Sequence, residues 1–115
     1  MTQTVPAPVW TPVCALSSIP PETGVAALLD DGTQVAVFRT GEDTVFAIGN
    51  IDPFSGAAVL ARGIVGDLRG VPVVASPMHK QHFDLRTGEC VDVAGVSVPT
   101  YPVRVQDGTI QLGRP

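Results

Sequence analysis

The side chains best suited to metal chemistry are His79 and His82, three positions apart, and the carboxylate of Asp52 further upstream. One carboxylate and two imidazoles are ligand types found in mononuclear metal centres. His82 falls in a short predicted strand at residues 81–84, where successive side chains point to opposite faces. Both imidazoles could therefore reach one ion only if the chain bends, and a mononuclear metal site stays an open alternative.

The run Ser76-Pro77-Met78-His79 resembles the second ligand box of a Rieske iron–sulfur domain. A Rieske [2Fe–2S] cluster has two Cys thiolates on one iron and two His nitrogens on the other, supplied as Cys-x-His and Cys-x-x-His. The first box should follow a strand that ends in a turn of small residues, which places Asp52 and Phe54 at its two ligand positions. Three of the four ligands are then missing, and only His79 remains.

These replacements do not suit a sulfide-bridged cluster, which needs thiolate or imidazole on both irons. We therefore expect neither an iron–sulfur cluster nor another metal at positions 52, 54, 76 and 79. The two loops should instead pack against each other through side chains. Asp52, which precedes Pro53, is expected to cap nearby backbone N–H groups. Phe54 and Met78 either fill the space of the missing cluster or form part of a contact surface.

Short strands are expected to position these loops. Apolar residues recur with a period of two, and 12 glycines and 11 prolines separate runs of β-branched residues, which is typical of an all-β sandwich or barrel. Strands are expected at residues 9–15, 24–29, 34–39, 45–50, 64–68, 71–76, 81–84, 101–106 and 109–112.

Three turns predict how the strands pair. Residues 30–32, 40–43 and 106–108 contain Gly or Asp where tight hairpins require positive φ, so these strands should form antiparallel meanders. Residues 54–61 are expected to form a loop with a 3₁₀ turn. With the ligand-box pattern, this predicts a Rieske-like antiparallel β-sandwich with an inserted loop subdomain at the former cluster-binding end. We expect one domain over residues 1–115, with a flexible segment at 1–8 and a degenerate cluster-binding subdomain at 50–84.

Composition argues against several functions. The net charge is −4 and the seven basic residues are scattered singly, so nucleic acid is not an expected partner. No apolar run approaches the roughly 20 residues that span a bilayer, and the proline-rich start of the chain does not read as a signal peptide. We expect a cytoplasmic protein in which Cys14 and Cys90 are free thiols.

Several short runs together resemble one family. The Asn-x-Asp-Pro-Phe box at 50–54, combined with Ser-Pro at 76–77, is its specific part, whereas the Phe-Asp-Leu-x-Thr-Gly run at 83–88 is shared across the Rieske superfamily. From about Trp10 to Leu112 the chain resembles the small subunit of bacterial assimilatory NAD(P)H-dependent nitrite reductase. That family looks like a Rieske domain that has lost its ligands.

The resemblance implies a partner and a role. The large subunit of that enzyme would carry FAD, a [4Fe–4S] cluster and sirohaem and reduce nitrite to ammonium. This chain has no dinucleotide fingerprint or cysteine quartet for these cofactors, so we expect a subunit that is inactive alone and stabilises or positions the large subunit. The candidate contact residues are expected at the tip formed by the two loops. Apolar side chains and Arg are common at the centres of interfaces. The candidates are Pro53, Phe54, Arg62, Met78 and Lys80.

Two alternatives stay open. The chain could be a cluster-free Rieske-like adaptor that docks on an oxygenase. It could also be a mononuclear metal protein that uses Asp52, His79 and His82.

Overall fold

The computed structural model describes residues 9–41, 44–78 and 80–114, which form strands and two short 3₁₀ helices. The strands are β1 (Val9–Ala15), β2 (Thr23–Leu28), β3 (Gln34–Arg39), β4 (Val45–Gly49), β5 (Ile64–Leu68), β6 (Val71–Ala75), β7 (His82–Asp84), β8 (Val103–Gln106) and β9 (Thr109–Arg114). The 3₁₀ helices are η1 (Leu16–Ser18) and η2 (Leu60–Arg62). The predicted flexible segment 1–8 and His79 lie outside the described residues.

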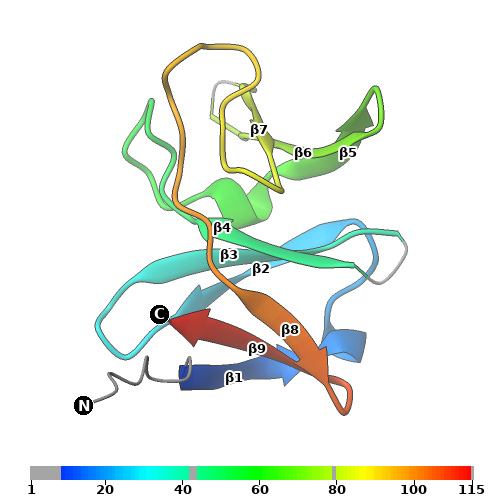
Figure 1. The fold of residues 1–115 in the computed structure, drawn as a ribbon. Helices are drawn as coiled ribbons and strands as arrows, with labels where there is room; N and C mark the ends of the chain where they lie inside the picture. Colours follow the sequence, from blue (N-terminus) through cyan, green and yellow to red (C-terminus); the bar gives the residue numbers. More distant parts are fainter. Residues whose placement is uncertain (1–8, 42–43, 79, 115) are drawn as a thin grey trace, which may run out of the picture.

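The strands form three antiparallel sheets of three strands each, in the orders β1-β9-β8, β2-β3-β4 and β5-β6-β7. Figure 1 shows the β2-β3-β4 sheet between the other two. The hairpins β2–β3, β3–β4 and β8–β9 pair as their turn residues predict. The pairing of β1 with β9, which places Val9 opposite Arg114, was not predicted because no local signal joins residues so far apart.

The middle sheet is covered on both faces, and its central strand β3 shows this most clearly. Val35 and Val37 pack toward the β1-β9-β8 sheet, in a cluster with Ile110. Ala36 and Phe38, which alternate with them, belong to a second cluster. Because successive side chains of a strand point to opposite faces, a run of four buried residues requires a layer on each side. The all-β prediction is confirmed for the described residues.

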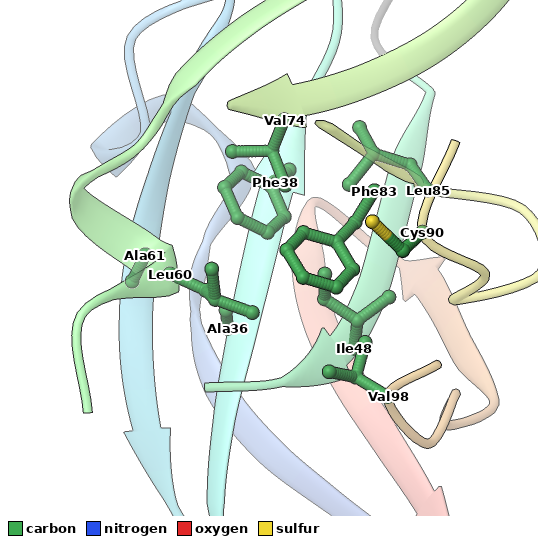
Figure 2. Close-up of a cluster of buried hydrophobic side chains, with 10 residues drawn as sticks. All are labelled: Ala36, Phe38, Ile48, Leu60, Ala61, Val74, Phe83, Leu85, Cys90 and Val98. Carbon is green, nitrogen blue, oxygen red and sulfur yellow. The ribbon is translucent and has the colours of Figure 1, made fainter. Parts of the chain in front are cut away.

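The second cluster attaches the β5-β6-β7 sheet to the middle sheet. In Figure 2 the ring of Phe38 lies beside Val74 of β6, and the ring of Phe83 of β7 lies near Ile48 of β4 and the sulfur of Cys90. Phe38 and Phe83 are among the largest fully buried side chains. Aromatic rings of this size supply much of the apolar area that a small core buries, so the loops on this sheet have a rigid base.

Several observed strands are shorter than predicted. β8 begins at Val103 because Pro102 has no N–H to donate to a ladder. The Tyr101 N–H instead donates to the Ala47 carbonyl, at 3.0 Å, which ties this segment to β4. β4 and β6 end before residues 50 and 76, and β7 begins after residue 81. The Ser76 N–H and the Gln81 carbonyl bond to each other in a loop, and the Asn50 carbonyl accepts from the Leu60 N–H. Within the described residues, no helix is long and apolar enough to cross a membrane.

Gly24 in β2 provides a test of the packing between the sheets. A Cβ added there would lie 2.6 Å from two carbons of the Phe38 ring and 2.9 Å from the Ala61 carbonyl oxygen. We expect Gly24→Ala to lower the free energy of unfolding by about 1–3 kcal/mol, the usual cost of overpacking. Gly66→Ala is the matched control because nothing lies within 4 Å of its added Cβ. Urea denaturation measures both, and equal losses would contradict the packing argument.

Candidate functional site

The first loop, after β4, is organised by Asp52. Its N–H donates to the Ala57 carbonyl at 2.8 Å, and its carbonyl accepts from the Gly56 N–H at 2.7 Å. Its side-chain Oδ1 accepts from the Phe54 N–H at 2.8 Å, which is an Asx turn. Gly56 has a φ of +73°, a conformation that glycine adopts without steric cost. Asp52 therefore does cap a nearby N–H group.

The second loop, after β6, repeats this arrangement around Ser76. The Ser76 N–H donates to the Gln81 carbonyl and its carbonyl accepts from the Lys80 N–H, both at 2.9 Å. The hydroxyl accepts from the Met78 N–H at 3.2 Å. Lys80 occupies the left-handed position with a φ of +62°, which costs a non-glycine residue about 1–2 kcal/mol. The two loops therefore form the same turn on different residues. In each, the N–H of the first residue bonds to the carbonyl five positions on, and its carbonyl accepts from the N–H four positions on.

A third copy of the turn follows β7 and contains no former ligand position. Asp84 donates its N–H to the Glu89 carbonyl at 2.8 Å, and its carbonyl accepts from the Gly88 N–H at 2.7 Å. Its Oδ1 accepts from the Arg86 N–H at 2.8 Å, and Gly88 has a φ of +79°. The turn therefore forms from local hydrogen bonds and does not need a metal to hold it.

The first and second loops meet through their organising residues. The Ser76 hydroxyl donates to Asp52 Oδ2 at 2.5 Å, a length found when the acceptor is a carboxylate. Asp52 is 0% and Ser76 1% exposed. These residues occupy the two Cys positions predicted from the sequence, so the side chains that should have shared one iron instead bond directly to each other.

The donor set does not fit a [2Fe–2S] cluster. A serine hydroxyl and a carboxyl are hard donors, whereas the cluster irons take thiolate and imidazole. Phe54 has no donor atom. Among the described residues no three His, Cys, Asp or Glu side chains are placed to hold a metal ion.

Asn50 is a residue of this site that the sequence analysis did not single out for a role. It is almost fully buried, and its Oδ1 accepts from the Ala61 N–H at 2.8 Å while its carbonyl accepts from the Leu60 N–H at 3.0 Å. It therefore fixes the start of the first loop to η2. An Asn directly after a strand, with one residue between it and Asp-Pro, was the available signal, because Asn readily bonds to neighbouring backbone.

The predicted contact residues lie at the surface. All five are exposed: Pro53, Phe54, Arg62, Met78 and Lys80. Met78 is 50% exposed, so the idea that it fills buried space is wrong. Phe54 is 36% exposed and its ring centroid lies 6.3 Å from that of buried Phe83. One edge of Phe54 therefore contacts the core while the rest faces solvent.

His82 bonds to Asp92, whereas the mononuclear metal alternative would group it with Asp52 and His79. Its backbone N–H donates to Asp92 Oδ2 at 2.6 Å, and its Nδ1 lies 3.0 Å from the same oxygen. The backbone N–H of His82, more than its imidazole, lowers the pKa of the Asp92 carboxyl. Asp92 also was not found by sequence reasoning, because nothing local links residues ten positions apart across a loop. His79, the other imidazole of that alternative, lies outside the described residues.

Comparisons with known proteins identify the family of this chain. Residues 9–113 match the family described as the Rieske-like [2Fe–2S] domain. The nitrite reductase (NADH) small subunit of Escherichia coli strain K12 is 49% identical over 104 residues, which cover 90% of this chain and 95% of that protein. The chain belongs to the Rieske-like domain family and, within it, to the nitrite reductase small subunits. The resemblance seen in the sequence and the prediction of a Rieske-like fold are confirmed.

Further comparisons place this fold among both subunits and ferredoxins. The solution structure of the E. coli protein NirD has a TM-score of 0.85 and 47% identity, covering 94% of this chain and 98% of that one. The ferredoxin of carbazole 1,9a-dioxygenase from Nocardioides aromaticivorans has a TM-score of 0.79 and 30% identity, covering 96% and 100%. A Klebsiella oxytoca protein named nitrite reductase [NAD(P)H] large subunit is 40% identical over 109 residues, which are 95% of this chain and 11% of that protein.

Removing the Ser76 hydroxyl tests the junction of the loops. Ser76→Ala leaves Asp52 Oδ2 buried without this donor, and we expect the free energy of unfolding to fall by about 1–3 kcal/mol. Ser55→Ala is the control, because Ser55 lies in the same loop and its Oγ only accepts an exposed bond from Ala57. Urea denaturation measures the loss. If both variants lose the same stability, the junction has no special role.

Titration of Asp92 tests the second contact. Because the backbone N–H of His82 is the largest cause of the lowered pKa, we expect His82→Ala to leave the Asp92 pKa still below the ordinary value of about 3.9. The lowered pKa stabilises the fold above that ordinary value, and this contribution is lost as pH falls through the lower folded-state pKa. Carboxyl NMR titration, with urea-denatured protein as reference, measures it. A return to the denatured value in His82→Ala would show that the imidazole dominates.

Proposed function

We propose that this chain is a non-catalytic subunit of an NAD(P)H-dependent nitrite reductase, in which it binds and stabilises or positions the large catalytic subunit. The observation that carries the proposal is the Klebsiella oxytoca large subunit, which contains a segment equivalent to 95% of this chain. A segment that is covalently joined to a protein in one organism acts there at high effective concentration. A separate chain of the same family can take that place by non-covalent binding.

The proposed division of labour places the chemistry in the partner. FAD, the [4Fe–4S] cluster and sirohaem would belong to the large subunit, which would reduce nitrite to ammonium. The Asp52–Ser76 bond at 2.5 Å supports this division because it joins the two positions that the ligand-box pattern assigns to the Rieske thiolates. We further propose that the protein acts in the cytoplasm and that residues 50–84 are a cluster-binding subdomain kept for its shape.

The loop tip is our candidate for the surface that meets the large subunit. Phe54 and Met78 are exposed apolar side chains there. Within residues 44–66 and 76–83 the Asp, Glu, Lys and Arg residues are Asp52, Arg62 and Lys80, and Asp52 is buried. In a chain with a net charge of −4, this tip therefore has exposed apolar side chains beside two cations, Arg62 and Lys80, and the Asp92 carboxylate lies next to it on His82. Its partner surface would have an apolar centre and carboxylates around it, since complementary charge favours encounter and register.

A second candidate is an adaptor that docks on an oxygenase. The similarity to the ferredoxin of carbazole 1,9a-dioxygenase, at 30% identity, favours it. The ferredoxin role needs a redox centre, however, and the donor set of this chain does not fit one. Only the docking part of that role could remain, and we consider the nitrite reductase subunit the better proposal.

A binding experiment with the large subunit tests the proposal. We expect the tagged chain to recover a long sirohaem-containing protein from native cells grown on nitrite. The double variant Phe54→Ser, Met78→Ser should recover less of it, because apolar anchors at an interface centre dominate affinity. Arg62→Glu with Lys80→Glu gives a second tip variant that leaves the Phe54–Phe83 contact intact.

Val105→Ser is the control, since Val105 is exposed to a similar degree as Phe54 but lies in β8. Circular dichroism confirms that each variant is folded before binding is compared. Recovery of an oxygenase instead would support the second candidate. Absence of any sirohaem protein from the wild-type eluate would contradict the proposal itself.

A further inference from the structure

Strand β5 is an open edge of the β5-β6-β7 sheet. Edge strands of natural sheets usually carry lysine, proline or a bulge that prevents pairing with another chain. β5 reads Ile64-Val65-Gly66-Asp67-Leu68, has no lysine or proline, and its register with β6 runs without a shift. Its one charged side chain is the exposed Asp67. Ile64 is 76% exposed. This edge therefore has no lysine, proline or bulge against strand addition, and its single charge, Asp67, favours a cationic segment over an acidic one.

The free backbone groups of this edge can be assigned from the hairpin. The two-residue turn 69–70 has positive φ at both positions, so Leu68 and Val71 form a hydrogen-bonded pair. Hydrogen-bonded pairs alternate along an antiparallel ladder. The N–H and C=O groups of Val65 and Asp67 consequently point away from β6. Among the described residues, the backbone N–H and C=O groups of Val65 and Asp67 make no hydrogen bond outside the ladder.

The position of Pro72 supports this assignment. Pro72 lies opposite Asp67 in the β5–β6 pairing, and its carbonyl accepts from the Leu85 N–H at 2.9 Å. Its carbonyl is thus directed away from β5. The Asp67–Pro72 pair is therefore a pair without mutual hydrogen bonds, as the alternation requires.

A groove of about 440 Å³ borders the same edge, a volume within the range of ligand-binding clefts. Its apolar lining comes from Phe46, Val65 and Pro72, and the charged residues that line it among those described are the acids Glu22 and Asp67. Thr40, Gly41 and Thr44 line it from the β3–β4 connection. In Figure 1 the β5–β6 hairpin lies on the opposite side of the molecule from the loop that follows β4, so the groove is separate from the loop tip.

We propose that the β5 edge binds an extended segment of a partner protein by strand addition, with a Lys or Arg side chain of that segment in the groove. Main-chain bonds to Val65 and Asp67 would align the segment, and alternate side chains would enter the groove. The aliphatic stem of a long cation would lie along Phe46 and Val65. Its charged end would meet Glu22 and Asp67, an arrangement suited to side chains with an apolar stem and charged head.

The source of the segment in the cell rests on the proposed function, since the large subunit would be the partner, but the strand site itself can be tested without it. The probe is a synthetic, fluorescently labelled peptide of alternating threonine and valine with one central lysine. The control is the same peptide with glutamate in place of the lysine. We expect the lysine peptide to slow amide hydrogen exchange at Val65 and Asp67 and to shift NMR signals along β5 and the groove, with weaker binding of the glutamate peptide.

Two substitutions that keep the backbone test the charge. Asp67→Asn retains the acceptor for the Gly70 N–H, which Asp67 Oδ1 binds at 2.6 Å, and Glu22→Gln keeps the side-chain length. We expect the double variant to weaken the lysine peptide about fivefold, as for two partly exposed ion pairs. Asp107→Asn, at an exposed turn residue between β8 and β9, should leave affinity unchanged.

Three results would overturn the inference. The lysine peptide does not bind, or the NMR signals that it shifts belong to the loop tip. The third is a concentration-dependent dimer that slows amide exchange in β5 without peptide, which would assign the edge to a second copy of the chain. If the peptide binds but the native-cell recovery fails, the strand site stands and the nitrite reductase proposal fails. If recovery succeeds while the peptide tests fail, only the strand site is contradicted.

Discussion

The hydrogen bond between the Ser76 hydroxyl and Asp52 Oδ2, at 2.5 Å, is the contact on which the arrangement of the two loops depends. Both residues are buried, and a buried carboxyl without donors costs far more than a buried apolar group. The Phe54 N–H satisfies Oδ1 within the first loop, and the Ser76 hydroxyl of the second loop satisfies Oδ2. This shared carboxyl therefore joins two loops whose organising residues lie 24 positions apart in the sequence.

Each loop on its own is closed by hydrogen bonds between its own residues. The chain makes the same turn around Asp52, Ser76 and Asp84. In each turn the side-chain oxygen accepts from the backbone N–H two positions on, and the residue four positions on has a left-handed conformation. Because the third of these turns never held a predicted ligand, the turn is a local module. A loss of ligands could thus leave each loop intact and require only a new contact between them.

One such contact contributes less than a structural metal site can. A structural metal site of zinc-finger type contributes about 10–16 kcal/mol, whereas one hydrogen bond to a charged group contributes about 1.5–3 kcal/mol. The remaining support comes from packing, since Phe83 and Val74 of the same sheet lie in the core cluster with Phe38. Asn50 adds a further tie by bonding the first loop to η2. The two loops are therefore held by the core packing of the β5-β6-β7 sheet and by η2 as well as by the Asp52–Ser76 bond.

Much of this followed from the sequence alone. The period of two and the turn residues determined the strands and three hairpins, because both depend on neighbours in the chain. The replacement of three ligands by Asp52, Phe54 and Ser76 determined that the donor set is wrong for a cluster, because donor chemistry belongs to each side chain. The resemblance of short motifs was sufficient for the family.

Only the tertiary structure decided which groups meet. The Asp52–Ser76 bond, the pairing of His82 with Asp92, the exposure of Met78 and the open edge of β5 all depend on distances through space between residues far apart in the chain. No local pattern encodes these distances. They arise when the layers pack on both faces of β3, and that packing decides which side chains are buried together and which backbone groups are left facing solvent.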